Sequence, residues 1–321
     1  MGDSMVTFED IIAAKERIEP YIIHTPLLRA PELDELVGCK VYLKLENFQI
    51  TGSFKLRGAT NFLVKLCEGG KVKGVVCASS GNHAKGVAYI SNKLGIEALI
   101  VMPTNCNITK LEGVKMLGGT VIFEGTKSSQ RNAKAKELQT QGYTLVHSHA
   151  DPNVIAGQGT IGIEIIEDLS DVDKIVVPLG GGGLISGISI AVKKNNPRVS
   201  IIGVEPSGAP RYRKSRDAGK AETINDVNTI ADGTRCDKAN PENFQVIESL
   251  VDDLVNIDDE SIREAMRILV KYARILAEPS SSLGIAAGIS GKLPITKEDK
   301  VCFVITGGNN DINQLCSIIN L

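Results

Sequence analysis

The chain is organised around one stretch, Thr51-Gly52-Ser53-Phe54-Lys55-Leu56-Arg57-Gly58-Ala59. A strand-like run at residues 41–46 precedes it and a helix-like run at residues 59–66 follows, so Lys55 is expected near the first turn of a helix. The positive end of the helix dipole and partial burial both disfavour an ammonium group, which lowers the pKa of the lysine. A lysine of lowered pKa is a nucleophile that forms Schiff bases with carbonyl compounds. The alternative is a solvated surface lysine, since buried lysines are rare.

The size and composition are those of a soluble globular protein. A chain of 321 residues is expected to form about two domains. Its 36 Lys and Arg nearly balance its 38 Asp and Glu, and there is no Trp, so neither a nucleic acid nor a membrane surface is an expected partner. No apolar run is long enough to span a bilayer, and residues 1–6 lack the features of a signal peptide. The seven scattered Cys show neither zinc spacing nor a disulfide framework, so a cytoplasmic protein with reduced thiols is expected.

Short apolar runs alternate with amphipathic helical segments along most of the chain. Thr7 and Asp10 suggest a capping box at the start of a first helix. The predicted strands cover residues 41–46, 74–78, 98–102, 120–123, 143–146, 174–178, 199–204 and 301–305. The predicted helices cover residues 59–66, 83–94, 108–117, 130–141, 161–169, 184–194, 260–272 and 281–289, with a last short helix at the end. This alternation is typical of β-α-β units and predicts an α/β fold with parallel strands.

Four polar or glycine-rich clusters follow predicted strands. They are Ser79-Ser80-Gly81-Asn82-His83, Gly180-Gly181-Gly182-Gly183, Glu205-Pro206-Ser207 and Thr306-Gly307-Gly308-Asn309. Ligands of open parallel sheets bind at the carboxyl ends of the strands, so these clusters are expected to meet at one edge and form an active site. Residues 205–245 are polar and lack periodicity, which is typical of a functional or interface segment.

The tetraglycine loop, residues 180–183, joins a predicted strand to a predicted helix. Glycines let backbone N–H groups turn inward, and the N-terminus of the following helix favours an anion, so a phosphate is the expected ligand. With Glu205 at the next strand end, the loop also suggests a nucleotide-binding module as an alternative function. The dinucleotide pattern G-x-G-x-x-G fails, however, because Ile185 and Ser186 stand where its third glycine is required. One phosphate therefore fits the loop better than a pyrophosphate.

Two further clusters offer hydrogen-bonding groups at strand ends. The cluster at residues 79–83 places hydroxyls and N–H groups at a predicted helix start, which suits a carboxylate, although a serine N-cap is the simpler alternative. His83 is expected to be a structural hydrogen-bonding residue rather than a base. Thr306 carries a hydroxyl that can pair with a ring nitrogen without holding a proton on it. Together with Lys55 and the tetraglycine loop, these groups would bind pyridoxal phosphate and an amino acid substrate.

The same motifs carry a resemblance to a known family. In chain order they are Ser53-Phe54-Lys55-Leu56-Arg57-Gly58-Ala59, Ser80-Gly81-Asn82-His83, Gly157-Gln158-Gly159-Thr160, the tetraglycine loop and Thr306-Gly307-Gly308-Asn309. The chain resembles the fold-type II pyridoxal phosphate enzymes of the serine/threonine dehydratase and serine racemase family over essentially its whole length. The resemblance implies mainly parallel twisted sheets flanked by helices. It also implies a small domain at residues 70–150, a large cofactor-binding domain at residues 1–69 and 151–321, and a homodimer.

The resemblance further implies a role for each motif residue. The cofactor-binding residues would be Phe54, Lys55, Asn82, Gly180, Gly181, Gly182, Gly183 and Thr306. Among these, Lys55 would hold the cofactor as a Schiff base and Thr306 would face its pyridine nitrogen. The substrate carboxylate would bind to Ser79, Ser80, Gly81, Asn82 and His83. Ser80 would act as the acid or base on the face opposite Lys55.

Two positions depart from the family pattern. Some members, serine racemases especially, have a loop of the form E-P-x-x-A-D-D that binds a divalent cation. Here the loop reads Glu205-Pro206-Ser207-Gly208-Ala209-Pro210-Arg211, without the two aspartates. Because Mg²⁺ and Ca²⁺ sites often use more than one carboxylate, we expect no metal ion at this loop, with the guanidinium of Arg211 in the vacant volume and paired with Glu205. The alternative is a relocated metal site, since Asp217 is close in sequence. His149 stands where the racemases tend to have an asparagine.

The sequence favours a lyase that converts L-threonine or L-serine to a 2-oxo acid and ammonia by β-elimination. Lys55 would remove the α-proton, and a neutral pyridine opposite Thr306 would be a sufficient electron sink because the β-hydroxyl departs quickly. One alternative is a serine racemase with side dehydratase activity, in which Lys55 and Ser80 serve the two faces of the substrate. A third possibility is a 3-hydroxyaspartate dehydratase, and the sequence does not rank these substrates.

Overall fold

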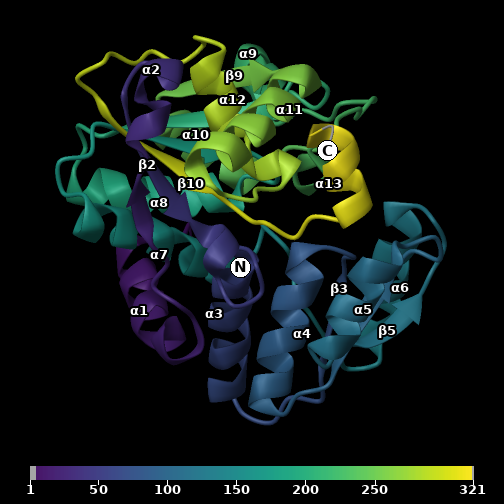
Figure 1. Ribbon diagram of the computed structural model, residues 1–321. Coiled ribbons are helices and arrows are strands. Elements are labelled where there is room, and N and C mark those ends of the chain that lie inside the picture. Colours follow the sequence, from purple (N-terminus) through teal and green to yellow (C-terminus); the bar gives the residue numbers. More distant parts are fainter. Residues whose placement is uncertain (1–4, 320–321) are drawn as a thin grey trace.

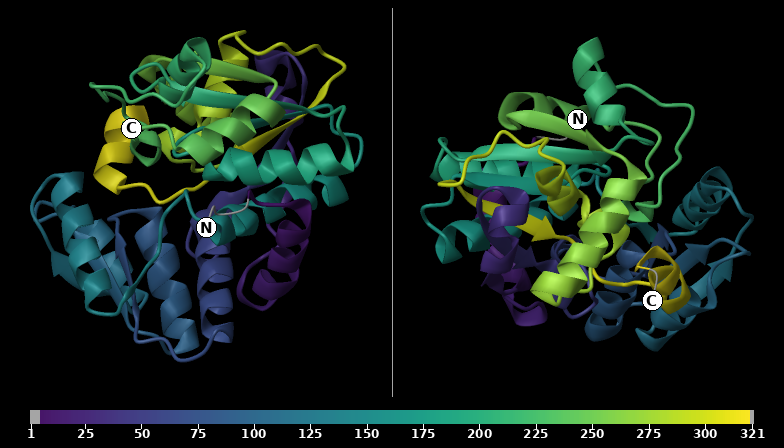
Figure 2. Two further views of the ribbon diagram at one scale, coloured as in Figure 1. Left: turned by 180° about the vertical axis from the view of Figure 1, so that it is seen from behind. Right: turned by 45° about the horizontal axis from the view of Figure 1, so that its top comes forward.

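The computed structural model describes residues 5–319 and contains two separate β-sheets (Figure 1). Residues 1–4, which are part of the segment without signal-peptide features, lie outside the described residues. The larger sheet has six strands and the smaller sheet has four. The smaller sheet is built from residues 75–145 alone, and this segment lies to one side of the remainder in each view (Figures 1 and 2).

Helices make up most of the chain between the strands. They are α1 (Phe8–Ile18), α2 (Asp34–Val37), α3 (Lys55–Glu68), α4 (Asn82–Leu94), α5 (Ile108–Met116), α6 (Ser128–Thr140), α7 (Pro152–Asp168), α8 (Gly183–Asn195), α9 (Arg211–Ala218), α10 (Pro241–Leu250), α11 (Asp259–Ile268), α12 (Leu283–Ile289) and α13 (Ile312–Ile319). The predicted capping box is present at α1, where Thr7 and Asp10 bond reciprocally. Within residues 5–319, no helix is both long enough and apolar enough to cross a membrane.

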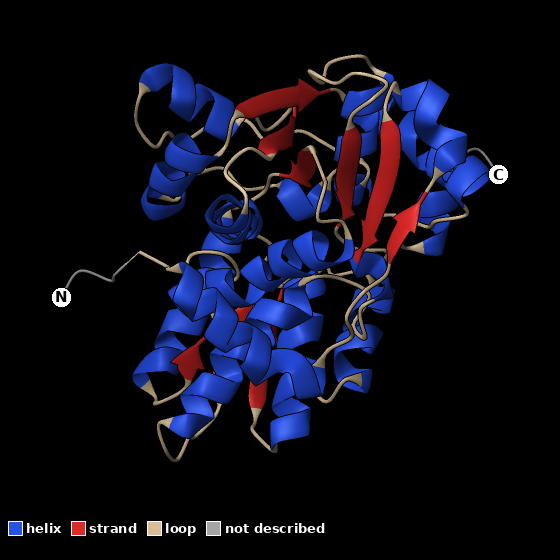
Figure 3. Cartoon of the chain, turned by 90° about the vertical axis from the view of Figure 1, so that its left-hand side faces the viewer, coloured by secondary structure: helices blue, strands red, loops and turns tan. Residues whose placement is uncertain are grey.

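The larger sheet is parallel except at one edge. Its strands in spatial order are β1 (Leu27–Arg29), β2 (Lys40–Leu45), β10 (Lys300–Ile305), β7 (Lys174–Pro178), β8 (Ser200–Pro206) and β9 (Asp253–Ile257). Only the pairing of β1 with β2 is antiparallel in this sheet. Helices cover both of its faces (Figure 3), as a parallel sheet requires.

The smaller sheet is entirely parallel. Its strands in spatial order are β5 (Thr120–Phe123), β4 (Ala98–Met102), β3 (Val75–Ala78) and β6 (Thr144–Leu145). Helices α3 and α4 share a hydrophobic core with one face, and α6 packs on the other face. The carboxyl end of β3 leads directly into the polar cluster that precedes α4.

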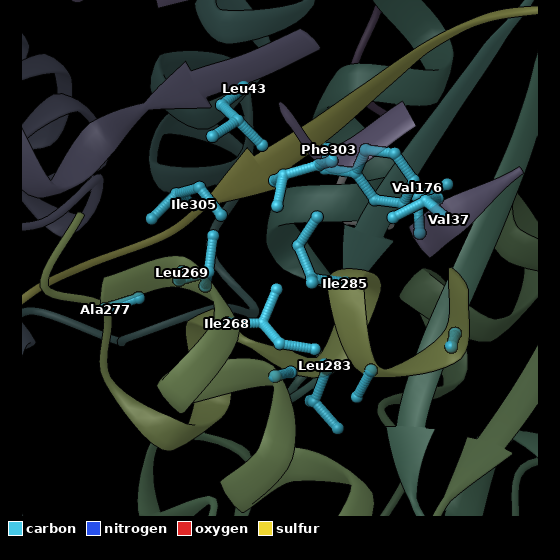
Figure 4. Packing of buried hydrophobic residues seen from close by; sticks show 14 of the residues in the cluster. Val37, Leu43, Val176, Ile268, Leu269, Ala277, Leu283, Ile285, Phe303 and Ile305 are labelled. Carbon is cyan, nitrogen blue, oxygen red and sulfur yellow. The ribbon is translucent and has the colours of Figure 1, made fainter. Parts of the chain in front are cut away.

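The central strand β10 shows how the larger sheet is held. Phe303 and Ile305 point to one face, where they pack with Ile268 of α11 and Ile285 of α12 (Figure 4). Val304 points to the opposite face and joins the core formed with α7 and α8, because successive strand residues alternate between faces. The strand is therefore packed on both faces, and this fixes the point at which the loop after β10 begins.

The predicted β-α-β alternation is confirmed, with differences in detail. The sequence predicts neither β1, a three-residue edge strand, nor β9, whose polar residues interrupt its apolar ones. Helix α7 begins at Pro152 rather than at residue 161, because close packing overrides the low helix propensity of its glycines. Residues 205–245 are more regular than expected, since they contain α9 and the start of α10.

Candidate active site

Lys55 is the first residue of α3. Its Nζ atom lies 5.0 Å from the centre of the Phe54 ring and donates a 2.8 Å hydrogen bond to the backbone oxygen of Ser148. Burial lowers the pKa of this amine from 10.5 to about 8, because the charged form loses hydration. Near neutral pH, Lys55 therefore presents far more of the nucleophilic neutral amine than a surface lysine does.

The start of α3 is anchored by buried charges. Arg57 is fully buried, and its guanidinium makes two hydrogen bonds to each of two carboxylates, Glu46 and Glu164. Buried Lys44 adds an ion pair of 2.7 Å with Glu164. At Gly58 the helix comes so close to α7 that an added Cβ would lie 2.7 Å from a backbone oxygen of that helix. These contacts fix the position from which Lys55 projects.

Ser148 and His149 connect Lys55 to the tetraglycine loop. The Ser148 hydroxyl lies 2.9 Å from Nδ1 of His149. The His149 ring packs on Gly181, where an added Cβ would lie 2.3 Å from the ring carbon Cγ. Desolvation and the neighbouring cationic groups lower the pKa of His149 well below 6.5, so the ring is neutral at pH 7. The loop therefore presents its backbone to His149 at a distance that only glycine permits, and Ser148 connects His149 to Lys55.

The tetraglycine loop turns the chain from β7 into α8. Gly182 is the N-cap of α8 and has a φ of 91°, a conformation that glycine adopts without strain. The Tyr212 hydroxyl and the Asn243 amide donate to the oxygen of Gly181 at 2.9 and 2.8 Å. The first-turn N–H groups of a helix have no intrahelical partners, and the helix dipole favours an anion there. The arrangement suits a single phosphate.

Asn82 begins α4 and belongs to a network with Glu278 and Asn309. Its side-chain amide donates to both carboxylate oxygens of Glu278 at 2.9 and 3.0 Å, and its oxygen accepts from Asn309 at 2.8 Å. Asn309 also donates to the backbone oxygen of Thr51 at 2.8 Å. Burial raises the pKa of Glu278. The network ties the helix of the smaller sheet to the end of β10 and to the segment just before Lys55.

Thr306 follows β10 and is held by Ser281. The two hydroxyl oxygens lie 2.8 Å apart. The backbone N–H of Phe54 donates to the oxygen of Thr306 at 3.0 Å, and Ser53 forms an antiparallel bridge with Gly307. The hydroxyl of Thr306 is therefore paired with a neutral hydroxyl, whereas the nearby carboxylate of Glu278 is bonded to Asn82 and Asn309.

The predicted carboxylate-binding cluster forms the loop and first turn between β3 and α4. Ser79, Ser80 and Gly81 make up the loop, in which the Ser79 hydroxyl accepts from Gly81 at 3.4 Å. His83 lies behind the loop with Nε2 at 3.0 Å from the backbone oxygen of Val146. Burial and the nearby Lys55 lower the pKa of His83 to about 3, so its neutral ring donates to this oxygen.

A second lysine near the site was not singled out from the sequence. Lys85 lies one turn along α4 from Asn82, and its Nζ donates to the side-chain oxygen of Asn309 at 2.8 Å. Burial lowers the pKa of Lys85 as well. The contact with Ser148, and through His149 with the tetraglycine loop, belongs to Lys55. This geometry favours Lys55 as the nucleophile.

These contacts bring together three of the four predicted clusters and Lys55, but not at one edge of a single sheet as predicted, because the cluster at residues 79–83 follows a strand of the smaller sheet and the other two follow strands of the larger sheet. The fourth, at Glu205, lies behind the tetraglycine loop, where it supports α9. Ser148, Glu278 and Ser281 were not predicted from the sequence. The last two belong to the run Ala277-Glu278-Pro279-Ser280-Ser281-Ser282, where an acid and three serines interrupt an apolar region, and this interruption was the available signal.

The residues present fit pyridoxal phosphate. The amine of Lys55 suits the aldehyde, and the tetraglycine loop, in which a Cβ would collide with His149, is a backbone cradle for the phosphate. Asn82 would hold the ring hydroxyl and Thr306 would face the ring nitrogen. When bound, this cofactor supplies an electron sink for negative charge at the Cα atom of an amino acid.

Comparison with known proteins agrees with this fit. A family model described as "Pyridoxal-phosphate dependent enzyme" matches residues 18–307. The chain is 43% identical over 317 residues to the L-threonine ammonia-lyase of Thermotoga maritima, covering 98% of this chain and 79% of that protein. It is 39% identical over 307 residues to a serine racemase of Oryza sativa subsp. indica, covering 94% of this chain and 90% of that protein.

A solved structure supports the same conclusion. The structure of maize serine racemase superimposes with a TM-score of 0.93 at 36% identity, covering 99% of this chain and 98% of that chain. The α/β fold with mainly parallel sheets and the family resemblance predicted from the motifs are both confirmed. The chain belongs to the family of pyridoxal-phosphate dependent enzymes.

Proposed function

We propose that this protein is an ammonia-lyase that converts L-threonine or L-serine to a 2-oxo acid and ammonia. For threonine, the Cα–H and Cβ–O bonds break, water leaves, and the resulting enamine takes up water to give 2-oxobutanoate and ammonium. The relatives named L-threonine ammonia-lyase and L-threonine dehydratase, at 43% and 39% identity, support this assignment.

Lys55 is the proposed base for the Cα proton. Its pKa of about 8 leaves a useful fraction of the amine neutral at physiological pH, and its place at the start of α3 is fixed by Arg57. Its hydrogen bond to the oxygen of Ser148 orients Nζ toward the side on which the tetraglycine loop lies. Phe54 packs beside the amine and limits the access of water.

The observation that carries the elimination is the pair of neutral hydroxyls at Thr306 and Ser281, 2.8 Å apart. The neutral hydroxyl of Thr306 would not hold a proton on a ring nitrogen facing it, so the cofactor would supply a weaker electron sink there. A weak sink suits a reaction in which the β-hydroxyl departs as soon as the Cα proton is removed. The N–H groups and hydroxyls of Ser79, Ser80 and Gly81 would hold the substrate carboxylate at the N-terminus of α4.

Serine racemisation is the second candidate activity. The serine racemases of rice and maize cover nearly the whole chain at 39% and 36% identity, respectively. In this reaction Lys55 would remove the proton from one face, and Ser80 would return it on the other. A 3-hydroxyaspartate substrate would undergo the same elimination as threonine, with a second carboxylate to accommodate.

A product assay separates these activities. The purified holoenzyme is incubated with L-threonine, L-serine, D-serine and 3-hydroxyaspartate, and 2-oxo acid, ammonia and both serine enantiomers are quantified. We expect 2-oxobutanoate and ammonia from L-threonine in equal amounts, faster than any inversion of serine. If inversion of serine is the dominant reaction, the protein is a racemase rather than a lyase. Absence of turnover with all four compounds would contradict both assignments.

We also propose that residues 70–150 form a small domain and that residues 1–69 and 151–321 form the cofactor-binding domain. The four-stranded sheet, built from one continuous segment, supports this division. Separate unfolding of that segment before the remainder, measured by hydrogen exchange, would support it, whereas one uniform transition across both sheets would contradict it.

A cytoplasmic homodimer is the proposed state of the protein. Its seven cysteines are all free thiols, which suits a reducing compartment. Ile23, Phe48 and Ile50 expose apolar side chains, and Gln49 bonds to the backbone of both isoleucines and so holds them together. Light scattering should give twice the chain mass for the protein and a smaller mass for Phe48→Glu, and a monomeric wild type would contradict the dimer.

A further inference from the structure

Arg211 lies in a cage of oxygen atoms behind the tetraglycine loop. The side chain is completely buried. Its guanidinium donates to five backbone oxygens, of which those of Leu179, Ala209, Thr234 and Cys236 lie at 3.1 Å and that of Gly180 is also in contact. A carboxylate oxygen of Glu205, also fully buried, lies 3.8 Å from Nη2. The cage thus joins the end of β7, the loop after β8 and the segment around residue 235.

Carbonyl and carboxylate oxygens of this kind are also the ligands that a hard divalent cation binds. Mg²⁺ and Ca²⁺ prefer oxygen ligands, and Ca²⁺ accepts six to eight carboxylate and carbonyl oxygens. Here the space is filled by a guanidinium, whose positive charge repels a second cation. Within residues 5–319, no group of three or more His, Cys, Asp or Glu side chains could hold a metal ion. The residues present therefore do not fit the divalent cation that the family pattern provides for at this loop.

We propose that Arg211 is a built-in cation that holds the tetraglycine loop in its phosphate-binding conformation, in the place of a metal ion. The proposal rests on the proposed function to the extent that the loop binds the cofactor phosphate. It makes Arg211 a positioning residue, because its guanidinium acts through the carbonyl groups of Leu179 and Gly180.

The neighbours of Arg211 connect it to the loop by a second route. Glu205 accepts the N–H groups of Tyr212 and Arg213 at 3.0 and 2.9 Å and so caps the start of α9. The adjacent Tyr212 donates its hydroxyl to the oxygen of Gly181 at 2.9 Å. Consecutive residues of α9 therefore hold consecutive carbonyls of the loop, those of Gly180 and Gly181. With these oxygens drawn backward, the peptide N–H groups are free to turn toward an anion on the opposite side.

The test compares two cofactor forms. The full-length protein is dialysed against graded pyridoxal 5′-phosphate or against pyridoxal, which lacks the phosphate, and bound cofactor is measured by absorbance. Arg211→Ala should weaken binding of the phosphorylated form roughly ten- to hundredfold, as expected for loss of charge-assisted hydrogen bonds, and leave binding of pyridoxal nearly unchanged. Equal weakening of both forms would show general damage to the fold and would overturn the proposal, as would no weakening of either.

A cation that replaces the missing guanidinium in Arg211→Ala should restore the phosphate-binding conformation of the tetraglycine loop. Methylguanidinium, Mg²⁺ or Ca²⁺ added to Arg211→Ala should recover affinity for the phosphorylated cofactor, because the emptied cage retains its oxygen ligands. Arg211→Lys, which keeps one charge but fewer donors, should bind with intermediate affinity and provides a second variant if the alanine protein does not fold. Failure of all these cations and of the lysine variant to recover affinity would contradict the proposal.

Arg213→Ala is the matched control. Arg213 also lies in α9, and its backbone N–H is bonded to Glu205. Its side chain, however, is about half exposed and pairs with Asp217 at 3.2 Å. Arg213→Ala and the wild type should both keep their cofactor affinity after exhaustive EDTA treatment. A loss in the EDTA-treated wild type that Mg²⁺ or Ca²⁺ reverses would overturn the proposal. Because cofactor affinity is the readout, the result does not depend on which amino acid the enzyme converts.

Discussion

The amine of Lys55 is the residue-scale property on which the proposed chemistry depends. Burial lowers its pKa from 10.5 to about 8, so in cofactor-free protein the neutral, reactive fraction rises through pH 8 and is nearly complete well below 10.5. We predict that the rate of its reaction with pyridoxal, followed by absorbance, rises with a midpoint near pH 8. A midpoint close to that of the ε-amine of Nα-acetyl-lysine, measured under the same conditions, would show that the amine of Lys55 is solvated.

The sequence predicted some residues of the site and missed others for a physical reason. Lys55, Asn82 and Thr306 each stand at a boundary between elements, where the local sequence shows both a turn and a functional group. Glu278 and Ser281 lie between two apolar segments and acquire partners only through contacts with Asn82 and Thr306, which are far away in the chain. No local pattern reports such a contact.

Helix α3 depends on the buried pairing of Arg57 with Glu46 and Glu164. We predict that Arg57→Leu destabilises the cofactor-free protein by about 3–5 kcal/mol, because two carboxylates lose their buried partner. Urea unfolding measures the difference. Lys134→Ala is the control, since its exposed pair with Glu137 on α6 is worth at most about 1 kcal/mol. Equal stability of the two variants would contradict a structural role for the buried pairing.

The same network gives stability an acid limit. Burial raises the pKa of Glu164, but the charges and hydrogen bonds of Arg57 and Lys44 outweigh this effect and leave its pKa below 4.5. The resulting stabilisation is complete above the unfolded pKa of 4.5 and is lost as the pH falls through the lower folded value. Near neutral pH this stabilisation by Glu164 is constant, so it causes no change of stability with pH there.

Most elements could be predicted from periodicity, and the exceptions have identifiable causes. Strands β4 and β7 occupy the predicted residues because each is a largely buried apolar run bounded by turns. Strand β5 also occupies the predicted residues, although it lies at the edge of the smaller sheet and is only partly buried. The early start of α7 was not predictable in this way. Its glycines, which disfavour a helix locally, are required because added Cβ atoms at Gly157 and Gly159 would lie 2.6 Å and 2.9 Å from backbone oxygens of α3 and α8.

At the scale of the whole molecule, the cofactor would join the two sheets. Asn82 belongs to the helix after β3, whereas the tetraglycine loop and Thr306 follow strands of the larger sheet. Because only the folded chain brings them together, we predict that cofactor at about 100 times its dissociation constant raises the free energy of unfolding by about 2.7 kcal/mol. Urea unfolding at several cofactor concentrations measures this. Stability independent of cofactor concentration would contradict the predicted bridge.

The identity of the lysine that holds the cofactor tests the account most directly. The holoenzyme is reduced with borohydride, digested and analysed by mass spectrometry, with Lys55→Ala and Lys85→Ala treated in parallel. The account predicts a pyridoxyl group on Lys55 in the wild type and in Lys85→Ala, and none on any lysine in Lys55→Ala. A pyridoxyl group on Lys85 in the wild type would contradict the account.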